Sequence, residues 1–247
     1  MSLFVIPMAG LSSRFFRAGY NVPKYMLPLG QQNMFCWAVS SFEQYYESDE
    51  FLFIIRNVYD TPDFVKSMVE SLGIKKYSIV VLDKETKGQA DTVYQGLQSV
   101  KDGQDIIIFN IDSRRIYYKK PSWLNDVDGY LEVFKGEGEH WSFVEPENAD
   151  STNVIRTTEK NRISDYCSDG LYYFRTKSLF TTAFEDALQH DKFEKGELYV
   201  APLYNYLISH HRNIRYDLIQ QHDIQFCGTP EEYTALLTCI RDGAKSK

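Results

Sequence analysis

A short loop near the N-terminus carries residues that can hold a chain of phosphates. It reads Met-Ala-Gly-Leu-Ser-Ser-Arg-Phe over residues 8–15, directly after an apolar stretch, and Pro23-Lys24 follow it. Small residues after a strand leave backbone N–H groups free to face phosphate oxygens, while Arg14 adds a fork of donors and Lys24 a mobile point charge. The loop has neither the three glycines of a dinucleotide-binding motif nor the GxxxxGK[ST] pattern. By itself it indicates either an anion site or a tight turn with a surface arginine.

The elements around this loop alternate between strands and helices. Apolar runs typical of buried strands are followed by segments with apolar residues at helical spacing. We expect strands at 4–7, 51–55, 77–82 and 106–109, and helices at 34–45, 61–72 and 88–100. This alternation predicts a parallel sheet with helices on both faces, in which ligands bind beyond the carboxyl ends of the strands. The loop at 8–15 and the residues after Phe109 stand at those ends.

The second half of the chain mixes strands and helices less regularly. We expect strands at 129–134, 141–145, 153–157 and 171–174, and helices at 179–188 and 197–209. A capping box with proline at the first helical position, over residues 229–232, begins a last helix. Because no repeat, low-complexity tract or linker is evident, we predict a single domain over residues 1–247.

Composition and charge exclude several classes of protein. The 247 residues are 43% hydrophobic and 25% charged, which is ordinary for a globular chain with its own core. The net charge of −7 argues against sequence-independent nucleic-acid binding, but a local basic cluster can still bind a small phosphorylated substrate. The four cysteines lack CxxC spacing and the five histidines include no HExxH, so we expect reduced thiols, a cytoplasmic location and no zinc site. No apolar run approaches a membrane span and no signal peptide is evident, so we expect no membrane partner.

The loop and several later segments together resemble the nucleotidylyltransferases, which join a nucleoside triphosphate to a sugar phosphate or a similar phosphate ester. Residues 9–15 followed by Pro23-Lys24 are similar to the opening signature of that family, A-G-x-G-[ST]-R-F and then P-K. Six further segments match in the family's order: Lys87-Gly88-Gln89-Ala90, Asn110-Ile111-Asp112, Glu159-Lys160, Asp169-Gly170-Leu171-Tyr172-Tyr173-Phe174, Gly196-Glu197-Leu198 and Gly228-Thr229-Pro230-Glu231. Each match is short, but the ordered set spans most of the chain.

The resemblance implies a fold and a set of site residues. The implied fold is α/β, a Rossmann-like three-layer α/β/α arrangement with a mixed, mainly parallel central sheet. It divides the domain into a nucleotide-binding half at 1–115 and an acceptor-substrate half at 116–247. The implied catalytic residues are Arg14, Lys24 and Asp112, and Asp112 also binds Mg²⁺. The residues expected to bind the nucleotide are Ala9, Gly10, Leu11, Ser12, Ser13, Asp83, Gly88 and Gln89, and those for the acceptor are Glu159, Lys160, Gly170 and Glu197.

The implied reaction is in-line attack by a substrate phosphate oxygen on the α-phosphorus of the nucleotide, with release of pyrophosphate. Because two anions must approach, catalysis consists mostly of charge neutralisation and alignment. Arg14 and the loop N–H groups suit the triphosphate, Lys24 the α-phosphate and Lys160 the incoming phosphate. Mg²⁺ prefers carboxylate and phosphate oxygens, which suits Asp112.

Three positions depart from the family pattern. Ser12 replaces the second glycine of the loop, and because serine tolerates positive φ poorly we expect the loop to differ slightly there. Ile111 replaces the usual glycine before Asp112. Phe226 stands where many members have a second metal-binding aspartate. Either Asp112 and the nucleotide phosphates hold the metal with waters, or another acid such as Asp223 substitutes.

Two other functions stay open. A glycosyltransferase of similar architecture usually shows Asp-x-Asp at its metal site, where this chain has Asn110-Ile111-Asp112. A catalytically idle nucleotide-binding regulatory protein would account for Phe226. The acceptor is open as well, because residues 6–10 resemble the branch of the family found in capsule and surface-polysaccharide products. Members of that branch act on sugar 1-phosphates or on other phosphates such as phosphocholine or phosphoglutamine, and a homo-oligomer is compatible with the sequence.

Asp83 bears on the choice of nucleobase. In thymidylyl and uridylyl relatives a glutamine lies five residues before the glycine that corresponds to Gly88, and here that position is Asp83. A carboxylate only accepts hydrogen bonds, so it disfavours the O4 acceptor of uracil or thymine and suits the N4 amino group of cytosine. The sequence therefore favours CTP over UTP and dTTP, unless Asp83 pairs with Lys84 or Lys87.

Overall fold

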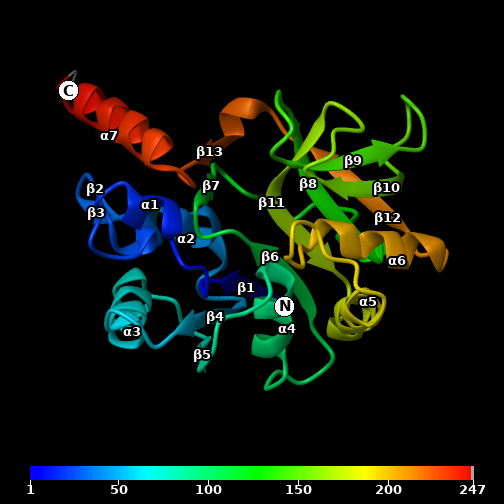
Figure 1. Cartoon of the computed structure of the whole chain (residues 1–247), viewed down its shortest axis with the longest axis horizontal. Helices are drawn as coiled ribbons and strands as arrows, with labels where there is room; N and C mark the ends of the chain where they lie inside the picture. Colours follow the sequence, from blue (N-terminus) through cyan, green and yellow to red (C-terminus); the bar gives the residue numbers. More distant parts are fainter. Residues whose placement is uncertain (246–247) are drawn as a thin grey trace.

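The structure, a computed structural model, describes residues 1–245 and has the predicted α/β architecture, with helices flanking a mixed, mainly parallel sheet (Figure 1). The described chain forms a nine-stranded sheet in the order β10-β9-β11-β6-β1-β4-β5, with β8 paired to β11 and β12 paired to β8. The strands are β1 (Ser2–Pro7), β4 (Glu50–Arg56), β5 (Tyr77–Leu82), β6 (Asp105–Phe109), β8 (Gly129–Lys135), β9 (Ser142–Pro146), β10 (Val154–Glu159), β11 (Tyr166–Phe174) and β12 (Ile214–Leu218).

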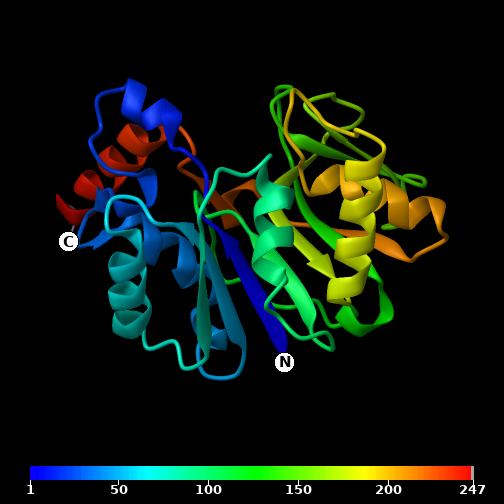
Figure 2. The same cartoon turned by 60° about the horizontal axis from the view of Figure 1, so that its bottom comes forward.

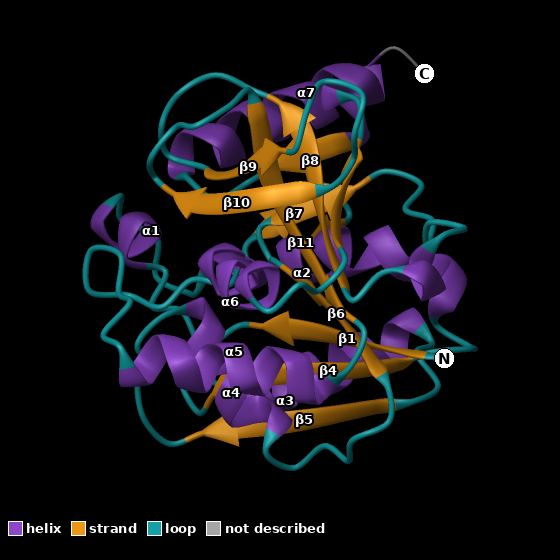
Figure 3. Ribbon diagram, turned by 90° about the vertical axis from the view of Figure 1, so that its right-hand side faces the viewer, coloured by secondary structure: helices purple, strands orange, loops and turns teal. Residues whose placement is uncertain are grey.

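The two halves of the sheet run differently. Strands β1, β4, β5 and β6 pair in parallel, as the alternation of strands and helices predicts. Strand β11 is antiparallel to β6, with Leu171 opposite Phe109, and β8 and β9 are antiparallel to β11. Figure 3 shows the sheet turning from β5 at one edge to β10 at the other. The residues after β1 and β6 lie at the same end, because parallel strands share one carboxyl edge.

Helices cover both faces of the sheet because successive side chains of a strand point to opposite faces. In β1, Phe4 and Ile6 belong to the core shared with α2 and α3, while Leu3 and Val5 belong to the core shared with α4, α5 and α6. Figure 2 shows α4 and α5 side by side on the second face. The helices are α1 (Ser13–Arg17), α2 (Met34–Val39), α3 (Thr61–Leu72), α4 (Gln89–Leu97), α5 (Lys177–Gln189), α6 (Tyr204–Ser209) and α7 (Pro230–Lys245). Short 3₁₀ helices are η1 (Lys24–Met26), η2 (Ser40–Tyr45), η3 (Leu124–Asp126), η4 (Ala201–Leu203) and η5 (Gln221–Asp223).

The last helix returns to the N-terminal half of the chain (Figure 1). The hydroxyl of Tyr233 in α7 donates to the carbonyl of Pro28 at 2.5 Å, and its ring centre lies 6.2 Å from that of Phe15. The predicted capping box is present, because Thr229 Oγ1 and the Glu232 carboxylate each accept the other residue's backbone N–H. Two small antiparallel pairs lie nearby: β2 (Pro28–Leu29) with β3 (Gln32–Asn33), and β7 (Ser113–Arg115) with β13 (Ile224–Phe226).

Some elements differ from the sequence-based expectation. The helix expected over 34–45 is α-helical only to Val39 and continues as η2, in which Phe42 has a non-helical φ of −115°. The helix expected over 88–100 spans 89–97, and the one over 197–209 begins only at Ala201, because the backbone of Leu198 is hydrogen-bonded to Lys87 and Ala90 instead. Strand β12 was not predicted, although its alternating Ile-Arg-Tyr-Asp-Leu sequence is a strand signal. Within residues 1–245, no helix is long and apolar enough to cross a membrane.

Candidate active site

Two adjoining pockets open at the carboxyl ends of the central strands. The first, which we call the loop pocket, is a cavity of about 460 Å³ lined by the loop after β1 and the start of α4. The second, the β11 pocket, has about 340 Å³ and is lined by β11 together with residues of β9, β10 and β13. Arg14, Gln89, Asp112 and Gly228 line both cavities, so the two pockets meet at these residues.

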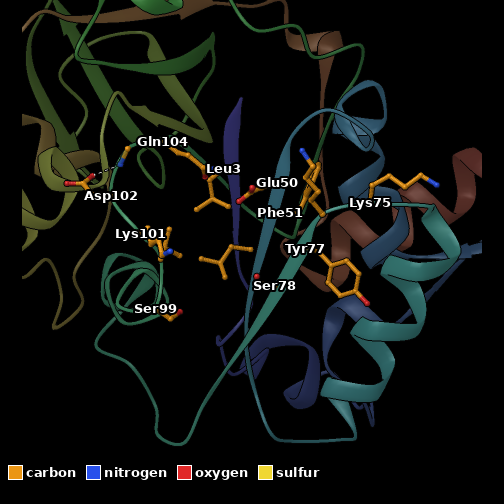
Figure 4. A pocket seen from close by; sticks show the side chains of 14 residues that line it. Leu3, Glu50, Phe51, Lys75, Tyr77, Ser78, Ser99, Lys101, Asp102 and Gln104 are labelled. Carbon is orange, nitrogen blue, oxygen red and sulfur yellow. Dashed lines mark hydrogen bonds between the residues drawn. The ribbon is translucent and has the colours of Figure 1, made fainter.

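A larger cavity of about 690 Å³ lies at the other end of the sheet (Figure 4). Its lining includes Leu3, Glu50 and Tyr77, which stand at the starts of β1, β4 and β5. Parallel sheets bind ligands beyond the opposite, carboxyl ends of their strands. Topology therefore favours the loop pocket and the β11 pocket as the functional site.

The loop after β1 has a left-handed residue at Ser12, where we expected serine to disfavour one. Ser12 has a φ of 52°, a conformation that costs a residue with a side chain roughly 1–2 kcal/mol. The hydroxyl helps to offset this cost, because it accepts a hydrogen bond from the backbone N–H of Lys24 at 3.2 Å. A glycine at this position could not make that bond. Ser12 therefore keeps the turn and also ties the loop to the Pro23-Lys24 segment.

Lys24 and Asp112 meet where the two pockets join. The Nζ of Lys24 lies 2.5 Å from Oδ2 of Asp112, and the two side chains are 21% and 24% exposed. The backbone N–H of Cys227 donates to the carbonyl of Asp112 at 2.8 Å, which fixes the backbone that carries the carboxylate. Both partners of the ion pair are thus accessible, and each can exchange the other for a charged ligand.

The turn before α4 packs against the segment 196–198, which brings two of the matched motifs together. The N–H of Leu198 donates to the carbonyl of Lys87 at 2.6 Å. Gly88 has a φ of 122°, and a Cβ there would lie 2.6 Å from the carbonyl oxygen of Leu198, so a side chain does not fit. This contact places Glu197 on the wall of the loop pocket.

Gly170 packs against the residue that ends β6. Its φ is 95°, and a Cβ there would lie only 2.3 Å from Nδ2 of Asn110. Gln89 in turn donates a hydrogen bond to Oδ1 of Asn110. Three of the matched motifs therefore converge on the β11 pocket, which all three residues line.

Lys160 is held in place by its neighbours on the β11 pocket. Its ammonium group donates to the hydroxyl of Tyr199 and lies 4.1 Å from the centre of that ring. It also lies 3.6 Å from Oε1 of Glu159, whose carboxylate accepts a hydrogen bond from Ser142. Burial raises the pKa of Glu159, with the Ser142 hydrogen bond and the Lys160 charge acting in the opposite direction. The pocket therefore presents a positioned cation with a buried carboxyl group beside it.

Phe226 belongs to an aromatic group on the wall of the β11 pocket. Its ring centre lies 4.8 Å from that of Trp141 and 5.3 Å from that of Phe134. The ring of His140 also joins the group, with its centre 4.4 Å from that of Trp141. The pairing of β13 with β7 sets Phe226 opposite Ser113, the residue after Asp112. An aromatic surface therefore stands where the family resemblance predicts a second carboxylate.

Most of the predicted site residues line these pockets. The loop pocket contains Ala9, Gly10, Leu11, Ser12, Ser13, Arg14, Lys24, Gly88, Gln89, Asp112 and Glu197. The β11 pocket contains Glu159, Lys160 and Gly170. Two placements differ from expectation: Glu197 lines the loop pocket instead of the acceptor side, and Asp83 is exposed and outside the lining of both pockets. Glu85 and Thr86 line the loop pocket near the position expected for Asp83.

Sequence reasoning missed several residues that line the β11 pocket, among them Trp141, Tyr199 and Glu232. Glu232 was identified only as part of the capping box, and its Oε2 does accept the backbone N–H groups of Gly228 and Thr229 at 2.7 and 3.0 Å. No local pattern marks Trp141 or Tyr199 as site residues. Their place depends on contacts between segments that are distant in the sequence.

The acidic residues around the junction fit a single hard cation bound through one protein carboxylate. Asp223, the suggested substitute for a second ligand, accepts the backbone N–H of Gln220 at 3.2 Å and lies outside the lining of both pockets. Among residues 1–245, no group of three or more His, Cys, Asp or Glu side chains could hold a metal ion. Mg²⁺ is commonly bound by one or two carboxylates together with substrate phosphates. The partly exposed Asp112 fits that pattern when a nucleotide supplies the phosphates.

Comparison with known proteins defines the class. No protein-family model and no curated protein matches the chain. The solved structure of the nucleoside-diphosphate-sugar pyrophosphorylase from Vibrio cholerae RC9 is 51% identical, with a TM-score of 0.92, and the match covers 95% of this chain and 99% of that one. A putative glucose-1-phosphate thymidylyltransferase from Bacillus anthracis is 18% identical, with a TM-score of 0.75 and coverage of 98% and 96%. The inositol-1-phosphate CTP transferase from T. maritima is 14% identical, with a TM-score of 0.73 and coverage of 98% and 97%.

The two more distant structures share the fold alone, whereas the Vibrio cholerae protein is close in sequence over almost the entire chain. The fold is that of a nucleotidyltransferase. The chain belongs to the nucleoside-diphosphate-sugar pyrophosphorylase family.

Proposed function

We propose that the enzyme joins a nucleoside triphosphate to a sugar 1-phosphate or a similar phosphate ester. An oxygen of the acceptor phosphate forms a new bond to the α-phosphorus, the bond from that phosphorus to the oxygen bridging to the β-phosphate breaks, and pyrophosphate leaves. The observation that carries this proposal is the junction of the two pockets at Arg14, Gln89, Asp112 and Gly228. Each pocket takes one substrate, and the reacting phosphates meet beside Lys24.

The loop pocket suits the triphosphate. It combines the small-residue loop 9–13 with the side chains of Arg14 and Lys24. Lys24 is paired with Asp112 at 2.5 Å, and an incoming phosphate chain offers its ammonium group an alternative anion. Lys24 then stands beside the α-phosphate, where negative charge develops in the transition state. A positioned cation at that point stabilises the transition state more than the ground state.

The β11 pocket suits the acceptor. Lys160 supplies a cation for the acceptor phosphate, and Tyr199 fixes the direction of that side chain. Trp141 and Phe226 present ring faces for the apolar face of a sugar ring, and Glu159 lies nearby to accept hydrogen bonds from hydroxyl groups. Acceptors with a phosphate at one end and a hydroxyl-bearing ring at the other match this distribution.

We further propose a requirement for Mg²⁺, held by Asp112 and the phosphates of the bound nucleotide. Such an ion neutralises phosphate charge and orients the reacting phosphate. Phe226 stands where the family resemblance predicts a second ligand, so the proposed metal site of the free enzyme relies on Asp112, and Lys24 already contacts that carboxylate. We therefore expect weak metal binding to the free enzyme and much stronger binding in the presence of nucleotide.

Pyrophosphate release is the direct test. The four common nucleoside triphosphates are combined with a panel of sugar 1-phosphates, phosphocholine and phosphoglutamine, with and without Mg²⁺. We expect release only when a triphosphate, an acceptor and the metal are all present. Release of a nucleoside diphosphate from a nucleotide sugar would indicate a glycosyltransferase. Nucleotide binding without any pyrophosphate release would indicate a regulatory protein.

The proposed substrates also bear on the subcellular location of the enzyme. Nucleoside triphosphates and sugar phosphates are cytoplasmic metabolites, and the four cysteines, Cys36, Cys167, Cys227 and Cys239, are free thiols. Free thiols are usual in a reducing compartment. We therefore propose a cytoplasmic enzyme that supplies an activated precursor for polysaccharide synthesis.

A further inference from the structure

Behind the β11 pocket, two carboxyl groups are buried next to each other. Glu132 in β8 is 1% exposed and Asp169 in β11 is 2% exposed, and the pairing of the two strands sets Glu132 opposite the segment that contains Asp169. Arg115 in β7 contacts the pair, because its Nε donates to Oε1 of Glu132 at 2.6 Å. Asp169 also lines the β11 pocket. The proposed reaction uses none of these three groups.

A hydrogen bond between these two groups requires a proton. Two ionised carboxylates cannot bond to each other, because neither has a donor. Oδ1 of Asp169 accepts the backbone N–H of Leu171 at 3.0 Å. Its Oδ2 is buried and has no hydrogen-bond partner among the described residues. A proton on the neighbouring Glu132 carboxyl would supply the missing donor.

The charges lead to the same requirement. Two buried carboxylates beside one guanidinium would leave a negative charge uncompensated, which is costly in a medium of low polarity. With one shared proton, the pair carries a single negative charge that Arg115 balances. The proton therefore satisfies both the hydrogen bonds and the charge.

The pair lies on an irregularity of β11 that shapes the pocket. The register of β11 against β8 shifts between Ser168 and Tyr172, so the residues between them bulge opposite Glu132. Asp169 closes this bulge by accepting the N–H of the residue two positions later. Gly170 stands in the bulge and reaches the pocket with a φ of 95°. Any movement of the Asp169 side chain is thus coupled to Gly170.

We propose that Glu132 and Asp169 share one proton and act as positioning residues, holding the bulge and Gly170 in the conformation that binds the acceptor. The proposal rests on the proposed function, in which the β11 pocket is the acceptor pocket. Loss of the proton removes a hydrogen bond and sets two carboxylates against each other. The bulge then shifts, and acceptor binding weakens as the pH rises. Nucleotide binding in the loop pocket does not depend on this pair.

The surroundings favour the protonated pair. Burial is the largest cause at both groups: it raises the pKa of Glu132 well above its usual range and that of Asp169 to about 6, while Arg115 acts in the opposite direction. The other titratable groups that interact with the pair or its arginine include Asp217 of β12, Asp223 of η5, Tyr118, Tyr130 and Tyr172. Because both pKa values are higher in the folded than in the unfolded chain, the pair's contribution to folding is complete at low pH and is lost as the pH rises through the folded values.

Glu132→Gln separates the proton from the shape of the side chain. The amide donates to Asp169 at every pH, and its oxygen still accepts from Arg115. In the wild type, the acceptor KM should rise about tenfold per pH unit above the upper pKa of the pair, since binding there requires one proton. In Glu132→Gln, this pH-dependent rise of the acceptor KM should be absent. The titration of the substrate phosphates is common to both proteins and cancels in the comparison, and kcat and the nucleotide KM should follow the same pH course in both.

Asp217→Asn is the matched control. Asp217 is a half-buried carboxyl on a neighbouring strand whose raised pKa is also opposed by Arg115, but it lies outside the β11 pocket. The acceptor KM of Asp217→Asn should follow the wild-type pH profile. A Glu132→Gln profile that parallels the wild type would overturn the proposal.

Infrared spectroscopy tests the shared proton without any substrate. The carbonyl band of a buried protonated carboxyl should be present in the wild type at pH 7 and missing in Glu132→Gln. Asp169→Asn serves as a second variant, in which the remaining carboxylate accepts from the amide and the band is again lost. A wild type without this band would refute the shared proton. A band at pH 7 in a protein that releases no pyrophosphate from any substrate pair would count against the proposed function while supporting the proton.

Discussion

The two pockets meet at Asp112, yet they are built in different ways. The loop pocket consists mainly of segments that directly follow parallel strands, together with the first turn of α4, and its charged side chains are exposed or partly exposed. The β11 pocket consists of antiparallel strands, a bulge and a return of the chain through β13, and its walls hold aromatic rings and buried carboxyl groups. The difference teaches that a local motif after one strand can mark the loop pocket in the sequence, whereas the β11 pocket depends on which distant segments pair.

The largest expected effect lies at the junction of the two pockets, where a substitution should lower the rate of the reaction itself. Lys24→Ala and Asp112→Asn should each lower kcat by on the order of 10²-fold or more, because a positioned charge contributes several kcal/mol to the transition state. Steady-state kinetics with Mg²⁺ provide the measurement, and thermal unfolding should remain close to wild type. Lys101→Ala, at the cavity on the opposite end of the sheet, is the control. Normal turnover of Asp112→Asn with Mg²⁺ would sink the assignment.

Gly170→Ala should separate the two pockets. A Cβ there meets Asn110 at 2.3 Å in a backbone conformation with positive φ, so the bulge must move. We expect the acceptor KM to rise at least about tenfold, which corresponds to roughly 1.4 kcal/mol, while the nucleotide KM stays near the wild-type value.

Gly73→Ala is the matched control for that experiment. Gly73 also has a positive φ, 76°, but no atom lies within 4 Å of a Cβ built there, and it ends α3 far from either pocket. This variant should lose only the stability that a side chain costs at positive φ, measured by thermal unfolding, without changing either KM. Equal changes in both KM values for Gly170→Ala would mean that the two pockets are not independent.

Phe226→Asp tests whether a carboxylate at position 226 can act as a second metal ligand. A carboxylate two residues before Gly228 should act as a second metal ligand and lower the half-saturating Mg²⁺ concentration by about tenfold, about 1.4 kcal/mol in binding. Loss of the ring from the Trp141 group should at the same time raise the acceptor KM. Phe226→Leu keeps an apolar side chain, so it should affect the acceptor alone. If the metal requirement of both variants is equal, position 226 does not face the metal.

The smallest expected effect concerns the base. We predict a preference for CTP in a competition between the four nucleoside triphosphates. Because Glu85 lines the loop pocket and Asp83 does not, Glu85→Gln should shift the preference by a few-fold, about 1 kcal/mol for one hydrogen bond, and Asp83→Asn by less. A shift of preference in Asp83→Asn but not in Glu85→Gln would indicate that Asp83 contacts the base after all. A clear preference of the wild type for UTP or dTTP would contradict a role for either carboxylate in selecting CTP.

The sequence predicted the loop pocket well because its signals are local. Gly10 and Arg14 follow an apolar strand, and the parallel pairing of β1 with β6 brings Asp112 to the same end of the sheet. Glu197 lines the loop pocket because its segment is docked against the turn at Gly88, a contact between regions distant in the sequence. Asp83 stands five residues before Gly88, and the chain between them does not bring it to the lining of the pocket.

The sequence by itself determined the alternating strands and helices, the loop after β1 and the order of the family motifs. Buried elements show a regular spacing of apolar residues, and turns show characteristic small residues, so both can be recognised in the sequence. Only the tertiary structure decided that the hydroxyl of Ser12 holds Lys24, that Phe226 joins an aromatic wall, and that Glu132 lies against Asp169. These contacts depend on the pairing and register of strands. A one-residue change of register would turn Glu132 to the other face of the sheet, and no local pattern in the sequence specifies that choice.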